Sequence, residues 1–439
     1  MTANAPWQGI RLTLMIGTIG LVLLLTQAYL SHAEQTSDAE GIQALMPALP
    51  DWLTFVGQLE IEITRQQNFN LTPPKSDTRT VIRPEFEIET HVQPWEPVEA
   101  LLVFNIADER AIQDDTDAEE PDDVIFELKE VYVRFNEILD SPLSLQIGRQ
   151  SFEDPRQWLY DEEIDAVRLF YHTSRFYLEA AIARVAIVEK DLINRHDTDD
   201  TDYLQLYGEY DFGPPLKLAA YVIAQDDNMP MGERPVFLGM RARGELLENL
   251  SYWLDTAHIR GKDDKRHIRA WGVDVGLTYL FDLPWEPLLI FSFAFGSGDG
   301  TPDSSTDTRF RQTGLQGNGA EFETSTEIQY YGEVLDSELS NLLIFTAGMT
   351  VHPLPDTSLT VMYHAYRQPT LSSEFREIAL DAEPTGESRD VGSEIDLMGI
   401  WEIGPAELKL VFGAFFPGNA FEAETGTAFF TQLRLQVQF

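Results

Sequence analysis

The chain ends in the sequence FFTQLRLQVQF (residues 429–439), whose side chains alternate strictly between two kinds. The second kind consists of Phe430, three glutamines and Arg434, and the first kind is apolar except for Thr431: Phe429, Leu433, Leu435, Val437 and Phe439. Alternation with a period of two indicates a β-strand that lies between two different environments. We therefore expect the chain to end in a strand with one apolar face and one polar face.

The same alternation recurs along most of the chain. It is clearest in five further segments: 59–63, 82–89, 176–182, 271–279 and 291–295. In a soluble sandwich the apolar faces would meet in a shared core, whereas in a transmembrane barrel they would face lipid and the polar faces would line a lumen. The alternation alone is therefore compatible with a transmembrane barrel and also with a secreted protein that folds as a β-sandwich or a β-helix.

Three features favour the barrel. The strands are about ten residues long, which is the membrane-spanning length of a tilted β-strand. Trp and Tyr recur near strand ends, as interfacial girdles require, and the polar faces carry charge and glycine. Closing the sheet also removes exposed edges. We predict an all-β fold, a transmembrane antiparallel up-and-down β-barrel, and the periodicity leaves barrels of about 16 and about 18 strands open.

Short turns alternate with long polar segments between the strands. The turns include 213–215, 353–356 and 404–405, and the long segments are approximately 108–123, 191–202, 296–321 and 368–392. This asymmetry is typical of outer-membrane barrels, so we expect the long segments at the outer surface. Asp299, Asp303 and Asp307 do not have EF-hand spacing, and we interpret their segment as a flexible outer loop.

The N-terminus has the pattern of a secretory signal peptide. Arg11 precedes an apolar run from Leu12 to Leu25, and a small-x-small site ends at Ala33. The run falls short of the ~20 residues that a membrane-spanning helix needs. We predict that residues 1–33 are a signal peptide and that residues 34–439 form the barrel; an uncleaved anchor extending to Leu30 is the alternative.

Composition excludes several classes of function. The 439 residues carry 31 Lys+Arg against 73 Asp+Glu, a formal net charge of -42, which argues against a nucleic-acid partner. The chain has no cysteine, so it has neither disulfides nor thiolate metal sites nor a lipid-modified Cys. Its eight histidines show no tight metal-binding spacing. We expect no metal and no cofactor.

Several segments resemble the alginate export family of outer-membrane porins. Those that carry the resemblance are 128–130 (LKE), 147–150 (IGRQ), 157–158 (QW), 163–166 (EIDA), 296–300 (GSGDG), 310–316 (FRQTGLQ), 338–342 (ELSNL) and 392–397 (GSEIDL). They occur in this order across nearly the whole chain after residue 33. The resemblance implies a single barrel of about 18 strands that passes a polyanionic uronate polymer through a constriction lined with basic groups and a few carboxylates.

The resemblance also implies particular lumen residues. It assigns basic roles to Arg83, Lys129 and Lys409, and carboxylate roles to Glu130 and Asp191. Strand parity independently places Arg83, Lys409 and Arg434 opposite the apolar faces of their strands. The predicted substrate-lining set is therefore Arg83, Lys129, Glu130, Asp191, Lys409 and Arg434.

The chain also departs from the family pattern. Ser151, Gly319 and Glu327 stand where the pattern leads us to expect arginines, and the link around Ile403–Ala406 is a tight turn. The polar faces of the first predicted strands carry many carboxylates: Glu60, Glu62, Glu85, Glu87 and Glu89. Like charges at ~4 Å repel by about 1–4 kcal/mol, so this pattern favours the alternative of a cation-preferring porin.

We predict a passive outer-membrane channel for a polysaccharide or small hydrophilic solutes. Its expected partners are outer-membrane lipid and lipopolysaccharide, an anionic polysaccharide or small solutes, and the periplasmic machinery that a polymer exporter needs. A hydrolase is the second class: the chain has no Gly-x-Ser-x-Gly, and the sequence suggests no partner for His364, so we expect no enzyme. A structural or adhesive barrel with a blocked lumen is the third.

Overall fold

The computed structural model describes residues 50–72, 77–116, 124–188, 190–193, 201–229, 232–325, 327–422 and 425–439. The predicted signal peptide, residues 1–33, lies outside these ranges. Among the described residues, no helix is both long enough and apolar enough to cross a membrane.

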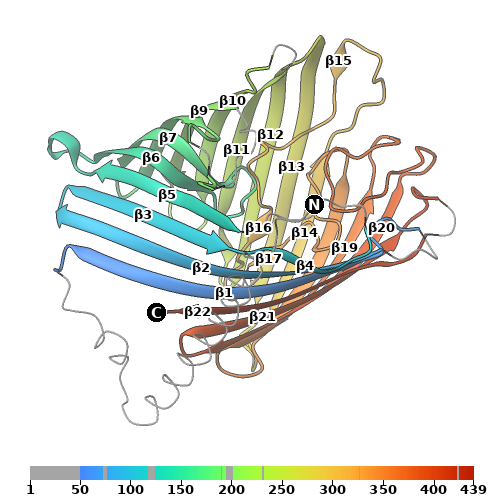
Figure 1. Cartoon of the computed structure of the whole chain (residues 1–439). Coiled ribbons are helices and arrows are strands. Elements are labelled where there is room, and N and C mark those ends of the chain that lie inside the picture. Colours follow the sequence, from blue (N-terminus) through green and yellow to red (C-terminus); the bar gives the residue numbers. More distant parts are fainter. Residues whose placement is uncertain are drawn as a thin grey trace, which may run out of the picture.

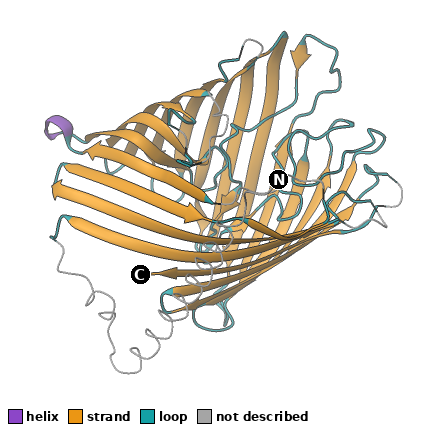
Figure 2. Cartoon of the chain, in the orientation of Figure 1, coloured by secondary structure: helices purple, strands orange, loops and turns teal. Residues whose placement is uncertain are grey.

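Long antiparallel strands make up the structure (Figure 2). The first half contains β1 (Leu53–Gln67), β2 (Thr78–Trp95), β3 (Val98–Ala107), β5 (Ile125–Phe135), β6 (Leu143–Glu153), β7 (Asp161–His172), β8 (Phe176–Arg184), β9 (Asp202–Asp211) and β10 (Lys217–Asp226). The second half contains β11 (Glu233–Leu247), β12 (Leu250–Asp263), β13 (Arg266–Leu280), β14 (Leu288–Gly296), β18 (Leu343–Val351), β19 (Thr357–Arg367), β20 (Asp390–Ile403), β21 (Ala406–Pro417) and β22 (Ala428–Gln438). The minor elements are β4 (Arg110–Asp114), which continues the β3 ladder along β2, the 3₁₀ helix η2 (Ile138–Asp140), β15 (Thr306–Asp307), β16 (Gly319–Ala320) and β17 (Ile328–Gln329).

Each long strand pairs with its neighbours in the sequence, and β1 pairs with β22 to close the sheet (Figure 1). The closing register aligns Glu62 with Arg434. The result is a closed antiparallel barrel of 18 strands, as predicted. Closure gives every long wall strand among the described residues a neighbouring strand on both sides, which is the requirement for a sheet in lipid.

The apolar parity of the strands faces outward. Val131, Val133 and Phe135 alternate along β5 and are each about 40% exposed, whereas the polar residues between them point into the barrel. The terminal Phe439 lies against β1, where a Cβ on Gly57 would approach its ring to 2.6 Å. A larger residue at position 57 would displace the terminal ring from the strand that closes the barrel.

The wall is irregular between β5 and β6, which pair only from Val131 to Phe135. The N-terminal half of β5, before Val131, bonds instead to the link after β8. The Leu128 N–H donates to the Lys190 carbonyl at 3.1 Å, and the Leu192 N–H donates to the Phe126 carbonyl at 2.8 Å. Arg149, which falls on the apolar parity, is buried here in an ion pair with Asp165 at 3.0 Å. It therefore supports the wall and does not line the pore.

Much of the buried core lies inside the barrel. Two connections fold inward: the short inward loop, residues 154–160, and the long inward loop, residues 297–325 and 327–342. Their large buried side chains include Trp158, Phe310, Tyr330 and Tyr331. In Figure 1, β16 and β17 of the long inward loop lie within the ring of strands. These residues narrow the lumen.

The segment of Asp299, Asp303 and Asp307, which we interpreted as a flexible outer loop, is exposed at Asp303 but is held on both sides of it by buried carboxylates. The part of residues 296–321 from Phe310 onward folds inward, against the expectation of an outer position. Asp299 and Asp307 are both 5% exposed, and they form ion pairs with Arg266 and Arg311, respectively. Phe310 and Leu315 of the same segment are buried in the core cluster. Apolar residues within an otherwise polar loop make the inward position favourable, because burying them inside the barrel removes them from water.

Candidate functional site: the charged lumen

Arg83 faces the lumen from β2. Its guanidinium lies 3.1 Å from Glu85, and the Arg83 side chain is 37% exposed. With Glu62, Arg79 and Glu109 it lines a pocket of about 240 Å³ on the inner wall. Arg83 is thus accessible to a solute in the lumen, although a carboxylate already accompanies it.

Lys129 and Glu130 are neighbours in the sequence, yet both face the lumen. A bulge makes this possible, because Val103 of β3 pairs with Glu130 while the next residue, Phe104, pairs with Leu128. The Lys129 ammonium donates to Glu87 across the strand between them at 2.8 Å. Glu130 accepts the backbone N–H of Ser151 at 2.9 Å and so links β5 to β6 where their ladder ends.

Asp191 has a structural position at the irregular part of the wall. Its side chain is 6% exposed and accepts the backbone N–H of Ile193 at 2.9 Å and that of Phe126 at 3.4 Å. These bonds attach the link after β8 to β5. The structure therefore places Asp191 in the barrel wall beside β5.

Lys409 and Arg434 face each other across β21 and β22. Arg434 pairs with Glu407 at 3.1 Å and is 27% exposed. Lys409 is only 8% exposed, and its ammonium donates to the Glu327 carbonyl of the long inward loop at 3.4 Å. Arg434 is accessible to a solute, whereas Lys409 is covered by the loop.

Carboxylates outnumber basic groups on this part of the wall. The register of β1 and β2 places Glu60 directly opposite Glu85, and Glu62 opposite Arg83. We use the name charged strip for the lumen-facing residues Glu60, Glu62, Arg83, Glu85, Glu87, Lys129, Glu130 and Arg434. Arg83 and Lys129 both have carboxylate partners within the strip, so it is a mixed and predominantly acidic surface.

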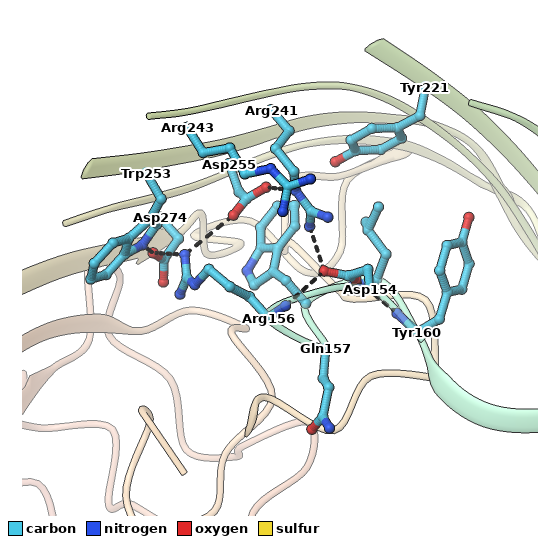
Figure 3. Close-up of polar contacts among 12 residues, drawn as sticks. Asp154, Arg156, Gln157, Tyr160, Tyr221, Arg241, Arg243, Trp253, Asp255 and Asp274 are labelled. Carbon is cyan, nitrogen blue, oxygen red and sulfur yellow. Dashed lines mark hydrogen bonds and ion pairs between the residues drawn. The ribbon is translucent and has the colours of Figure 1, made fainter. Parts of the chain in front are cut away.

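The opposite side of the lumen contains a buried ion-pair cluster that sequence reasoning missed. Arg156 of the short inward loop lies 2.8 Å from Asp274 on β13 and 3.2 Å from Asp255 on β12 (Figure 3). Arg241 on β11 pairs with Asp255 and, at 2.7 Å, with Asp154. We call these five residues the buried cluster.

Aromatic residues complete the buried cluster. The Arg156 guanidinium lies 4.5 Å from the ring centre of Trp253 and 4.4 Å from that of Tyr330. Asp274 also accepts the Trp253 indole N–H at 2.6 Å and the Tyr331 hydroxyl at 2.8 Å. Both inward loops are therefore bonded to the same wall strands. In the sequence, the only sign of this cluster is that Asp274 lies on the polar face of its strand. The alternation gives no indication that its partner is Arg156, more than a hundred positions away.

A second anchor holds the long inward loop against β19 and β20. Glu394 accepts the backbone N–H groups of Val334 at 2.6 Å and Leu335 at 3.0 Å. His364, for which the sequence suggested no partner, is fully buried and lies 3.2 Å from Asp396 and 2.9 Å from the Thr346 hydroxyl. In the part of the chain that the structure describes, no three His, Cys, Asp or Glu side chains are grouped to hold a metal ion.

A closed 18-strand barrel with an apolar outer face and a charged, partly filled lumen defines a porin-like channel of the outer membrane. Residues 51–430 match the family model described as alginate export, and the protein belongs to that family.

Two curated relatives are both described as alginate production protein AlgE. The protein from Pseudomonas aeruginosa is 24% identical over 324 residues, covering 64% of this chain and 65% of the relative. The protein from Azotobacter vinelandii is 27% identical over 181 residues, covering 36% of each chain. The alignment thus spans less than two thirds of the length of either relative.

Solved porin structures share the fold. Pseudomonas aeruginosa OccK2 (OpdF) matches with a TM-score of 0.58 and 12% identity over 90% of this chain and 99% of that chain. OccK7 (OpdD) of the same organism matches with a TM-score of 0.56 and 14% identity over 89% and 99%. At these identities the likeness concerns the barrel architecture alone.

Proposed function

We propose that the protein is a passive outer-membrane channel through which a polysaccharide passes. The observation that carries the proposal is the charged strip, in which basic groups form partly exposed ion pairs along one side of a partly filled lumen. Family membership supports a polysaccharide cargo. The name of the curated relatives makes a uronate polymer the first cargo to test.

The ion pairs of the charged strip suit transient binding. Exposed pairs contribute only about 0–1 kcal/mol each, so Arg83 or Arg434 can exchange its protein carboxylate for a group on the cargo at little cost. Lys129 is 32% exposed and has the same capacity. Glu130 and Asp191 would act as positioning residues through the backbone groups they accept, and Lys409 would meet the cargo only if the loop above it moved.

The test is polymer block of the ion current through the purified full-length protein in a planar bilayer. We expect added polyuronate or a neutral polysaccharide to interrupt the current. The double variant Arg83→Ala/Arg434→Ala removes two accessible basic groups and should lower anion passage, whereas Arg234→Ala, which removes an exposed pair with Asp226 on β10, should not. Unchanged anion passage in the double variant would refute the role of the basic groups.

A cation-preferring porin that does not handle alginate is the second candidate. The facing glutamates Glu60 and Glu85 favour it, because they leave the charged strip with a surplus of negative charge. Cation selectivity without block by any polysaccharide would support this candidate over the first.

We further propose that residues 1–33 are removed as a signal peptide after Ala33, which leaves residues 34–439 in the outer membrane in contact with lipid and lipopolysaccharide. Mass spectrometry of the protein isolated from outer membranes should find Glu34 at the N-terminus. Neither the charged strip nor the buried cluster is proposed to do catalysis, and the expected partner of a polymer channel is a periplasmic synthesis and export machinery.

A further inference from the structure

We infer that a pocket in the lumen wall formed by β7, β8, β9 and β11 binds a neutral pyranose residue. The pocket has a volume of about 300 Å³ and lies below the short inward loop, toward the end of the barrel where the short turns are. This volume is at the lower end of the ~300–1,000 Å³ of small-molecule sites, which suits one or two sugar rings. The inference rests on the proposed function for the kind of solute.

Two tyrosines and two glutamates form a square on the floor of the pocket. The register of β8 and β9 places Tyr177 opposite Glu209 and Tyr207 opposite Glu179. The Tyr177 hydroxyl donates to Glu179 at 2.6 Å, and the Tyr207 hydroxyl donates to Glu209 at 3.0 Å. These bonds fix the orientation of both rings, whose centres are 6.0 Å apart.

The rings remain available to a solute. Tyr177 and Tyr207 are half-buried on the lumen side of their strands, and His172 lies with its ring 6.0 Å from that of Tyr177. An aromatic ring of this kind offers an apolar surface beside a polar edge. The C–H face of a pyranose has matching apolar character, and its hydroxyls can reach the carboxylates at the rim.

The charges of the pocket favour a neutral sugar over a uronate. Arg168 pairs with Glu179 at 2.9 Å, Arg243 with Glu209 at 3.2 Å and Arg241 with Asp154 at 2.7 Å. Because Glu153 also lines the pocket, its described lining contains four carboxylates and three arginines. A uronate carboxylate would thus meet arginines that are already paired and a surplus of negative charge, whereas sugar hydroxyls can donate to carboxylate oxygens.

Isothermal titration of the full-length, detergent-purified protein tests the inference. The probes are a neutral mannohexaose and a hexamannuronate. We expect the neutral probe to bind the more tightly and Tyr207→Leu to weaken its binding about 10-fold, the size expected for loss of a good ring contact. Tyr210→Leu is the matched control, because Tyr210 lies on the same strand but faces outward and is 39% exposed.

The variant Tyr207→Phe separates binding from folding, since it keeps the ring and removes only the bond to Glu209. It should bind the neutral probe within about 3-fold of the parent protein. Absence of binding by the neutral probe, tighter binding of the uronate, or equal losses in Tyr207→Leu and Tyr210→Leu would each overturn the inference. Failure of the proposed function would appear separately, as an ion current that no polysaccharide blocks.

Discussion

The charged strip and the buried cluster use the same residue types on opposite sides of one lumen. In the strip, Arg83 and Glu85 are 3.1 Å apart with side chains 37% and 14% exposed. In the cluster, Arg156 and Asp274 are 2.8 Å apart with side chains 10% and 0% exposed. Water screens the first pair, whereas the second lies where the electrostatic interaction is strong and an unpaired charge is costly.

Burial, and not residue type, separates the roles of the two regions. An exposed pair can exchange partners with a solute, so it can influence what passes. A buried pair fixes the position of both inward loops and thereby determines how much of the lumen is open. Variants of each region should therefore differ in which property they change.

The largest effect is expected for Arg156→Ala. Removing Arg156 leaves Asp274 buried without its ion-pair partner, whereas Asp255 keeps Arg241, and breaking a buried pair costs about 3–5 kcal/mol. Chemical denaturation of the purified protein should show this loss, and bilayer recordings should show a larger conductance as the short inward loop is released. Arg234→Ala is the control, with an expected loss of about 0–1 kcal/mol.

An intermediate effect is expected for Gln312→Ala in the long inward loop. The buried Gln312 amide donates to the Trp158 carbonyl at 2.9 Å and accepts the Leu339 N–H at 2.9 Å, which joins the two inward loops. Leaving these groups unpaired should cost about 1–3 kcal/mol, measured by denaturation. Gln316→Ala in the same loop removes a bond to a more exposed N–H and should cost less. Equal losses would mean that Gln312 is not the junction.

A smaller effect is expected from pH. Burial of Glu338 in the long inward loop raises its pKa to about 7, even though Arg376 and the Gln312 N–H act in the opposite direction. A carboxylic acid with a raised folded pKa takes up a proton when the loop docks, so docking weakens as pH rises from about 4.5 to about 7. Current fluctuations should be more frequent at pH 8 than at pH 5. Glu338→Gln should remove the difference; if it persists, other groups are responsible.

The smallest effect on stability, and a clear effect on selectivity, is expected in the charged strip. Arg83→Ala should change the free energy of unfolding by about 0–1 kcal/mol. It should also shift the reversal potential in a salt gradient toward cations, because Glu85 then lacks its counter-charge. Glu85→Gln should shift it toward anions. Shifts of the same sign in both variants would contradict the assignment of this pair to the ion path.

The sequence predicted the wall of the barrel well, because alternation directly reports the two environments of each strand. The alternation along each strand was enough to place Arg83, Arg434 and Lys409 on the lumen side. The filled lumen could not be predicted in this way. Phe310 and Leu315 lie in a segment whose composition is otherwise that of an exposed loop, and the partners of Arg156 are about a hundred positions away in the sequence. The bulge that turns Lys129 inward was likewise hidden, since it depends on the register with β3.

The most direct test of the proposed polysaccharide path is current block in a planar bilayer under a salt gradient, with the reversal potential recorded before and after polysaccharide is added. A passive polysaccharide channel should conduct ions through the charged strip and show interruptions of the current by polyuronate or neutral polysaccharide. These interruptions should be altered in Arg83→Ala/Arg434→Ala. A cation-selective current that neither polymer interrupts would contradict the account and leave a cation-preferring porin with the same barrel.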